Sequence, residues 1–411
     1  MDFTYCKLKD VLKAIYSGGT PSTSVAEYWG GSYKWLSSGE TGQRFISNTI
    51  NTITERGVKE SSTRLAKRGS IVMACAGQGK TRGQTSFLLD EMYVNQSIIV
   101  LNPDETKVFP LYLFYDLGMR YEELRGGSDA SSIRGSITTA ALKTLPFSFP
   151  DIEKQKRIAS ILFSYDSLIE NNTQRIKVLE QMAENLYKEW FVRFRFPGHE
   201  TTEFKNGIPK GWEEQRLGQF GVSLDSGSRP LGGVDDSLNE GIPSLGAESV
   251  NGLGEFDYND VKLIPHEYYR KMKRGKNTGN DILVYKDGAY IGKTTIFMKD
   301  FPFAQFAVNE HVFLLNASES EYQLYLYFTL HLREYFVLMQ NLNRNAAQPG
   351  LSKPDMNRIK IVVPTVAIIQ KFNAIVKPIM DNVFCLASQR YNLVKQRDLL
   401  LPRLMSGKLE V

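Results

Sequence analysis

An internal repeat constrains the fold of this 411-residue chain more than any other feature of its sequence. Residues 17–21 (SGGTP) in the first half have a counterpart at 226–230 (SGSRP), 209 positions later. Further along, Pro150 corresponds to Pro364, 214 positions later, so the two copies differ only by short insertions. A repeated sequence carries a repeated pattern of buried and turn residues, and it therefore specifies a repeated structure. We expect two similar units in place of one large domain.

Each half has the same order of segments: a mixed block, a proline, and a long polar stretch with helical periodicity. Short β-type runs such as 97–101 (SIIVL) and 311–315 (HVFLL) lie between glycine-rich turns in the blocks. The expected fold class is α/β (α+β), with two similar globular domains, two long helices that form an antiparallel coiled coil, and a pseudo-two-fold internal repeat. The expected boundaries are 1–150 for the first globular domain, 151–196 for the first helix, 197–211 for a linker, 212–364 for the second globular domain and 365–411 for the second helix.

The two helices show heptad patterns, in which apolar residues recur at alternating steps of three and four. Asp151 and Thr365 are the expected N-caps. Pro197 is expected to end the first helix, and Pro402 to end or kink the second. The residues expected to pack the helices against each other are Leu162, Ile169, Ile176, Leu179, Leu186, Ile379, Val383, Leu386, Leu393 and Leu400.

Polar residues interrupt this seam at Asn172, Arg390 and Arg397, where we expect them to set the register of the helix pair. A helix of about 40 residues extends about 60 Å, which is longer than a small domain is wide. Pairing of the two helices with each other is therefore the favoured interpretation. The alternative is that each helix folds back into the core of its own block.

Composition excludes several classes of protein. The net charge of +5 is compatible with a polyanionic partner but does not establish one. Three cysteines and four histidines are scattered without the short paired spacing of ligands, so no disulfide framework and no metal site are expected. The sequence has no apolar run long enough to span a membrane, and its N-terminus lacks the pattern of a secretory signal. We expect a cytoplasmic protein that does not enter a membrane.

Two segments suggest enzymatic chemistry. Residues 74–81 (ACAGQGKT) approximate a phosphate-binding loop, but the following residues are a poor start for the helix that such a loop requires. The carboxylates at Asp104 and Glu105 suggest a nuclease, yet the other copy retains neither. No motif for holding an exocyclic amine during methyl transfer is present. We expect no catalytic residue, and the alternative is a stand-alone duplicated nuclease or phosphate-loop enzyme acting on DNA.

Basic and polar residues suited to nucleic acid are more plentiful. Residues 268–276 combine two tyrosines with five cations, although a run of this kind is often only a solvated surface. Arg134 and Gln348 occupy corresponding positions of the two copies, and Arg suits guanine whereas Gln suits adenine. The candidate DNA-binding residues are Lys80, Thr81, Arg82, Arg134, Arg270, Lys271, Lys273, Arg274, Lys293, Thr294 and Gln348.

Several motifs in order resemble the specificity subunit of type I restriction–modification enzymes. Residues 17–23 (SGGTPST), with 28–31 (YWGG) and 35–40 (WLSSGE), are similar to the start of a target recognition domain in that family. Residues 188–197 (KEWFVRFRFP) resemble its central region, and 400–407 (LLPRLMSG) resemble its C-terminus. The second copy departs from the first, since Arg229 stands where Thr20 does. This departure suggests unlike half-sites.

The resemblance implies two target recognition domains that each read one half of a split site in double-stranded DNA, with the paired helices setting the spacer. It also implies partners: two modification (methyltransferase) subunits docked around the helices, and restriction (translocase and nuclease) subunits. Those partners would then bind S-adenosylmethionine, ATP and magnesium, and this chain would hold no cofactor. A scaffold that binds only protein remains a third interpretation.

Overall fold

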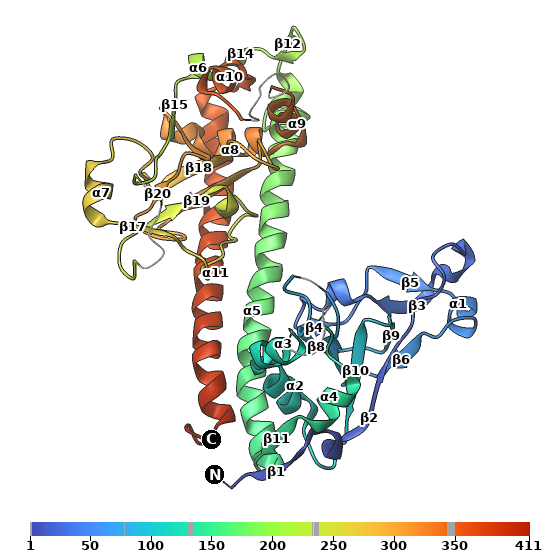
Figure 1. Cartoon of the computed structure of the whole chain (residues 1–411). Coiled ribbons are helices and arrows are strands. Elements are labelled where there is room, and N and C mark those ends of the chain that lie inside the picture. The colour runs from blue at the N-terminus through green and yellow to red at the C-terminus, as the bar shows by residue number, and fades with distance from the viewer. Residues whose placement is uncertain (1, 78, 130–134, 232, 234–237, 343–349) are drawn as a thin grey trace. The chain divides into compact units, whose positions relative to one another are not determined.

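We describe a computed structural model of the chain, which covers residues 2–77, 79–129, 135–231, 233, 238–342 and 350–411. The chain forms two compact units (Figure 1). Unit 1 comprises residues 1–167 and 394–411, and unit 2 comprises residues 168–393. Each unit therefore contains one globular block together with part of each long helix. The expected domain boundaries place the helices outside the blocks, whereas the contacts divide both helices between the units.

Unit 1 is built on a five-stranded sheet of order β2-β10-β7-β8-β4. Neighbouring strands are antiparallel except for β4 and β8. Helix α2 (Pro110–Met119) contributes a run of buried residues to the same core. The strands are β2 (Leu12–Ser17), β4 (Phe45–Ile46), β7 (Ile71–Ala74), β8 (Thr85–Leu88) and β10 (Ile98–Pro103).

The apolar run of β7 is buried on both faces. Ile71 and Met73 belong to the hydrophobic cluster that includes α2, whereas Val72 between them belongs to a separate cluster. That second cluster includes Leu36 and Met92, which belong to another sheet. Since successive side chains of a strand point to opposite faces, a continuous apolar run suits a strand placed between two layers.

The second sheet of unit 1 has the order β5-β3-β9-β6, with β3 and β9 parallel. A short antiparallel pair, β1 with β11, joins the beginning of the chain to the segment that precedes the first long helix. These strands are β1 (Thr4–Lys7), β3 (Trp29–Leu36), β5 (Asn51–Ile53), β6 (Arg64–Ala66), β9 (Met92–Val94) and β11 (Pro146–Phe149).

Unit 2 repeats most of this topology, although β4 and β6 of unit 1 have no counterpart among the strands that the structure describes. Its main sheet, β15-β21-β18-β19, matches β2-β10-β7-β8, and its parallel pair β16 and β20 matches β3 and β9. The pair β14 and β22 matches β1 and β11, so the predicted duplication is confirmed. The strands are β14 (Glu213–Arg216), β15 (Val222–Ser226), β16 (Ile242–Leu245), β17 (Leu263–Ile264), β18 (Asn280–Tyr285), β19 (Thr294–Met298), β20 (Ala307–Val308), β21 (Val312–Ala317) and β22 (Lys360–Val363).

The long helices are α5 (Ile152–Tyr187) and α11 (Val366–Met405). Asp151 caps α5, because its Oδ1 accepts a hydrogen bond from the Lys154 amide at 3.0 Å. A π-helical turn follows α5 at Lys188–Val192, so the helical segment ends before Pro197. Pro402 does not end the second helix, since α11 continues to Met405. None of the described helices is long and apolar enough to cross a membrane.

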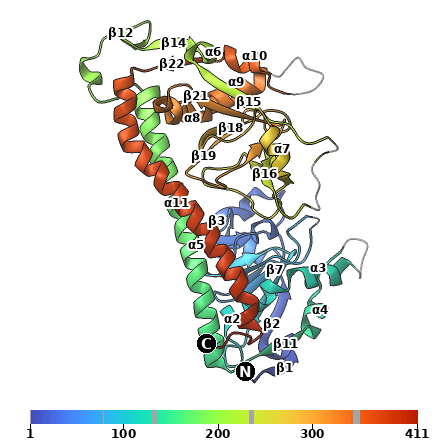
Figure 2. The same ribbon diagram turned by 90° about the vertical axis from the view of Figure 1, so that its left-hand side faces the viewer.

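Within each unit, a stretch of α5 lies beside a stretch of α11 (Figures 1 and 2). In unit 1, the early residue Leu162 shares a cluster with the late residue Leu404. In unit 2, the late residue Tyr187 meets the early residue Phe372, with ring centroids 6.2 Å apart. The helices are therefore antiparallel in both units.

The predicted packing residues lie along this seam to different depths. Leu162, Ile176, Val383 and Leu386 are buried. Those that the structure places at intermediate exposure are Ile169, Leu179, Leu186, Ile379, Leu393 and Leu400. Burial of the predicted packing residues is thus deepest at Leu162 in unit 1 and at Ile176, Val383 and Leu386 in unit 2.

Candidate nucleic-acid interface

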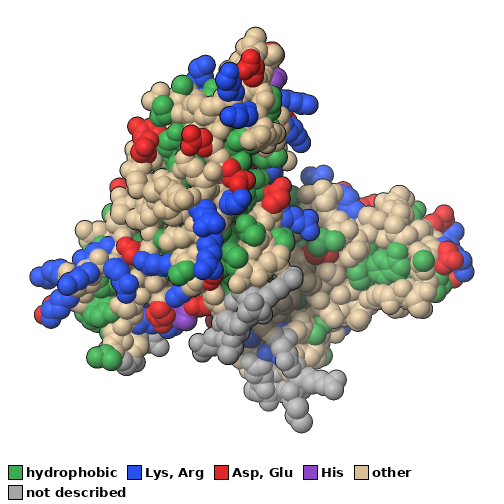
Figure 3. Space-filling model, turned by 90° about the horizontal axis from the view of Figure 1, so that it is seen from above, with side chains coloured by type: hydrophobic (Ala, Val, Ile, Leu, Met, Phe, Trp, Pro, Cys, Tyr) green, Lys and Arg blue, Asp and Glu red, His purple; other side chains and the backbone are tan. Residues whose placement is uncertain are grey.

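A cationic segment follows β17 in unit 2. It comprises helix α7 (His266–Lys271) and the chain to Lys276. Three of its cations, Arg270, Lys273 and Arg274, are exposed and form no salt bridge with any residue that the structure describes. Figure 3 shows lysine and arginine side chains gathered at the left edge of that view, where α7 lies. These three side chains therefore give the edge positive charge, which attracts polyanions.

Local contacts hold the rest of the segment in place. Lys271 pairs with Glu267 at 3.1 Å, one helical turn away. Lys276 lies 4.8 Å from the centroid of the Tyr269 ring, and its Nζ donates to the Arg270 carbonyl at 3.3 Å. Burial, and to a lesser degree the charge of Asp281, raise the pKa of Tyr269, so this phenol remains protonated near neutral pH.

A cavity of about 280 Å³ lies between this segment and the loop after β15. The Ser228 hydroxyl lies 2.8 Å from the Tyr268 hydroxyl, which itself donates to the Arg229 carbonyl at 2.8 Å. Hydroxyl groups beside cationic side chains suit the binding of phosphate oxygens. The lining residues are Ser226, Gly227, Ser228, Tyr268, Lys271, Met272, Lys273 and Arg274.

Two glycines explain why the repeated loop and the cationic segment meet. A Cβ on Gly227 would lie 1.7 Å from the Val308 carbonyl oxygen. A Cβ on Gly275 would lie 2.4 Å from the Cα of Gly227, and Gly275 has φ +72°. The Gly275 carbonyl accepts a hydrogen bond from the Val308 amide at 2.8 Å. Backbone therefore packs directly on backbone here, which only glycine permits.

The equivalent loop in unit 1 makes the same close approach to a strand but has different side chains around it. A Cβ on Gly18 would lie 2.0 Å from the Val94 carbonyl oxygen, which matches the approach of Gly227 to Val308. Here the neighbours are aromatic: Trp35 Nε1 lies 3.4 Å from the Gly19 carbonyl, and the Trp35 ring packs edge-on against Trp29 at 5.0 Å. The equivalent loops of the two units thus have neighbours of different chemistry, the buried Trp35 in unit 1 and the cationic segment in unit 2.

The loop between β7 and β8 holds three candidate residues of unit 1. Lys80 is exposed, and its carbonyl accepts a hydrogen bond from the Tyr121 hydroxyl at 2.7 Å. Thr81 is of intermediate exposure. Arg82 is only 6% exposed, so burial opposes its predicted contact with DNA. A β-strand follows this loop where a phosphate-binding loop needs a helix, and the phosphate-loop alternative is therefore not supported.

The corresponding loop of unit 2 lies between β18 and β19. Lys293 is half-buried and its Nζ lies 3.4 Å from Asn251 Oδ1. Thr294 is 2% exposed, and its hydroxyl lies 3.1 Å from His331 Nδ1. Its burial opposes the predicted contact with DNA, because an inward-facing strand residue does not reach a ligand outside. Arg134 and Gln348 lie outside the described residues.

The sequence therefore located the cations near α7 but not the cavity beside them. Ser226 and Ser228 belong to the repeated segment 226–230, which could be explained as a tight turn without any binding role. The sequence signal for the cavity was the pair of glycines, Gly227 and Gly275, which lack side chains. Their close approach joins segments that are almost 50 positions apart, which local patterns do not reveal.

Comparison with known proteins identifies the family. The chain matches the model of the type I restriction modification DNA specificity domain over residues 1–181 and 209–396. It is 29% identical over 426 residues to the type I restriction enzyme MjaIX specificity subunit of Methanocaldococcus jannaschii, covering 100% of this chain and 94% of that protein. It is 23% identical over 414 residues to the MjaVIII specificity subunit of the same organism, covering 100% and 93%.

A solved structure shares the fold. The type I restriction-modification system S subunit from M. genitalium superposes with a TM-score of 0.63 at 16% identity, covering 98% of this chain and 96% of that one. The duplicated fold thus defines a class of proteins built from two recognition units. The chain belongs to the type I restriction–modification DNA specificity family and is a specificity subunit, as its sequence motifs predicted.

Proposed function

We propose that each unit reads one half of a bipartite site in double-stranded DNA and that α5 and α11 set the spacer between the halves. One observation carries this proposal: equivalent glycine loops approach a strand carbonyl in the same way in both units, but the loop lies beside cations in unit 2 and beside tryptophans in unit 1. A repeated scaffold with unlike surfaces suits the reading of two unlike half-sites. In unit 2, the cavity beside α7 would receive a backbone phosphate and so position the reading loops.

Exposed apolar residues on both helices support the docking of partner subunits there. Apolar residues that neighbour each other on a surface indicate protein interfaces, and Val178 and Met182 lie one helical turn apart on α5. The residues concerned are Leu168, Val178, Met182, Ile375 and Leu399, each between 47% and 56% exposed. Two modification subunits would dock around the helices, and restriction subunits would join them.

The assembled complex would carry type I site-specific deoxyribonuclease and adenine DNA methyltransferase activities. S-adenosylmethionine, ATP and magnesium would be held by the partner subunits, and this chain would contribute no catalytic residue. The complex would act in the cytoplasm, where the host DNA is. If the purified chain cleaved DNA or hydrolysed ATP without partners, the proposal that catalysis belongs to the partner subunits would be contradicted.

Lengthening the helix pair tests the spacer role. Seven residues inserted after Glu170 in α5 and seven after Asn392 in α11 preserve the heptad phase and extend each helix by about 10 Å, or about three base pairs. Mapping of methylated bases with the reconstituted complex should then show a longer spacer and unchanged half-sites. Insertion into α5 alone is the control, since it breaks the pairing and should abolish assembly. An unchanged spacer in the double insertion would refute the role of the helices.

A further inference from the structure

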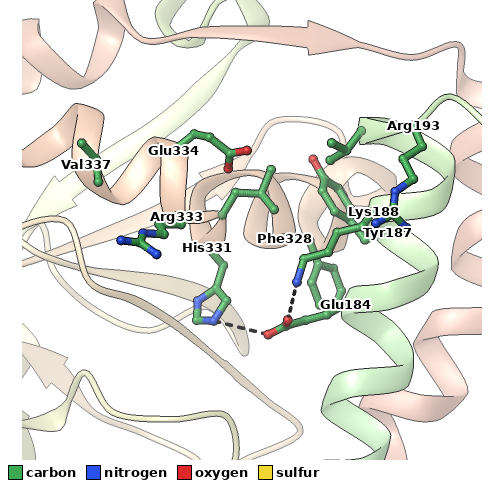
Figure 4. Close-up of a pocket in the computed structure, with 11 residues that line it drawn as sticks. Glu184, Tyr187, Lys188, Arg193, Phe328, His331, Arg333, Glu334 and Val337 are labelled. Carbon is green, nitrogen blue, oxygen red and sulfur yellow. Dashed lines mark hydrogen bonds and ion pairs between the residues drawn. The ribbon is translucent and has the colours of Figure 1, made fainter.

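Two glutamates and one histidine converge inside unit 2. Glu180 and Glu184 lie one turn apart on α5, so their carboxylates share one face of the helix. His331 is the last residue of α8 (Gln323–His331). One ligand atom from each of the three residues lies within 4.8 Å of the others, and His331 Nε2 is 3.8 Å from Glu184 Oε1. Figure 4 shows Glu184 and His331 facing each other from the two helices.

Neighbouring groups orient these side chains. The Thr294 hydroxyl lies 3.1 Å from His331 Nδ1, which leaves Nε2 directed at Glu184. Lys188 Nζ donates to Glu184 Oε2 at 2.9 Å, which leaves Oε1 directed at His331. The Tyr327 ring packs against the imidazole with centroids 5.2 Å apart. Metal-binding histidines and carboxylates are commonly held in this way, by a hydrogen bond to the atom that does not bind the metal.

The charges of the cluster favour a cation. Glu180 and Glu184 are both partly buried, and their carboxylates lie together with the His331 imidazole, so two acidic groups share a place with restricted access to water. The Thr294 hydroxyl occupies the Nδ1 side of the imidazole, so the Nε2 side faces the carboxylates. Among the described residues, Lys188 is the only lysine or arginine that forms a salt bridge with either carboxylate.

We propose that Glu180, Glu184 and His331 bind a divalent transition-metal ion of the Zn²⁺ type, which ties α8 to α5 within unit 2. One imidazole nitrogen with two carboxylate oxygens is a ligand set suited to Zn²⁺, whereas Mg²⁺ prefers oxygen ligands alone. A cavity of about 850 Å³, which Glu184 and His331 help to line, gives the ion a path of entry and room for a water molecule as the fourth ligand.

This inference departs from the expectation that the chain holds no metal. That expectation rested on short spacings between ligands, and here the histidine lies almost 150 positions beyond the glutamates. The proposed ion is structural and independent of the DNA-reading role. A chain that binds no metal could therefore still read DNA, and a chain that does not read DNA could still bind the metal.

Titration of the full-length chain with Zn²⁺ tests the proposal. After chelation and removal of any affinity tag, calorimetry should show one equivalent of Zn²⁺ bound and the melting temperature should rise. Mg²⁺ at the same concentration should leave the melting temperature unchanged. Binding at less than one equivalent, or an equal effect of Mg²⁺, would overturn the proposal.

Substitutions then locate the ion. Glu184→Gln and His331→Gln keep the side-chain shape, and each should weaken Zn²⁺ binding more than 100-fold, whereas Thr294→Val should weaken it by about 10–100-fold through loss of orientation. His199→Gln is the matched control, because His199 also lies near a carboxylate, 3.4 Å from Glu200, but has no third ligand among the residues that the structure describes. Melting of each metal-free variant checks that it is folded. The visible absorption of bound Co²⁺ should disappear in Glu180→Gln, and its persistence in folded Glu180→Gln and His331→Gln would refute the site.

Discussion

Arg397 of α11 donates a hydrogen bond from Nη1 to Asp166 Oδ1 of α5 at 2.6 Å, and both side chains are almost fully buried. The Tyr115 hydroxyl donates to Asp166 Oδ2 at 2.7 Å, and Arg44 Nη2 donates to the same oxygen at 3.3 Å. Asp166 therefore links the globular block of unit 1 to both helices. Burial alone would lower the pKa of Arg397, but Asp166 and then Asp398 raise it, so the guanidinium stays charged.

Removing Asp166 should destabilise unit 1. Asp166→Ala leaves the Arg397 guanidinium buried without its carboxylate, and loss of one partner of a buried ion pair costs about 3–5 kcal/mol. Chemical denaturation followed by circular dichroism measures the change. The control is Asp398→Ala, since Asp398 binds the same arginine at 2.8 Å but is 54% exposed, and exposed pairs contribute about 0–1 kcal/mol. Equal effects of the two substitutions would contradict the role assigned to Asp166.

The sequence could predict the helices and their register residues but not this partnership. Heptad spacing is a local pattern, and Arg397 interrupts it visibly. Asp166, in contrast, is not among the predicted packing residues, and its partners Arg44, Tyr115 and Arg397 come from three different segments. Contacts between residues more than 200 positions apart leave no periodic signal. Helix α11 also passes through Pro402, because packing of Leu404 and Met405 in the core outweighs the lost hydrogen bond.

The candidate interface also depends on contacts between distant residues that the sequence does not reveal. The cations near α7 stand out in sequence because they are consecutive, whereas the cavity depends on Gly227 meeting Gly275. Arg82 and Thr294 were predicted as surface residues from charge and motif, yet each is buried by the fold around its hairpin. Residue type alone does not tell on which face of a strand a residue lies.

Neutralising the cations beside the cavity should reduce the salt dependence of DNA binding. If Lys273 and Arg274 each neutralise one phosphate, the double change to alanine should reduce the slope of log K against log[salt] by about 1.8. Fluorescence anisotropy of the complex with labelled DNA over a range of salt concentrations measures this slope. Lys205→Ala, another exposed lysine of unit 2, is the matched control. A double variant with the slope of the wild type would show that α7 does not face DNA.

Adding a methyl group at Gly227 should damage the cavity. In Gly227→Ala the new Cβ would overlap the Val308 carbonyl oxygen, so the strands must move apart at a cost of about 1–3 kcal/mol. Gly18→Ala should do the same in unit 1, because its Cβ would overlap the Val94 carbonyl oxygen. Gly126→Ala has open space around it in α3 (Tyr121–Asp129) and should be neutral or slightly stabilising. Thermal melting ranks the three variants, and a neutral Gly227→Ala would disprove the close approach.

A buried carboxyl should make unit 1 more stable in mild acid. Asp116 of α2 is 5% exposed, and burial raises its pKa to about 6 although Arg120, 2.9 Å away, opposes the shift. Because the folded-state pKa lies above the unfolded value of about 3.9, the stabilisation is full below pH 3.9 and is lost as pH rises through 6. We therefore expect Asp116 to contribute more stability at pH 5 than at pH 7.5. In Asp116→Asn this difference should vanish, so comparison of melting temperatures of the two proteins at the two pH values isolates the carboxyl from every other titrating group. A variant that keeps the full pH difference of the wild type would exclude Asp116 as its source.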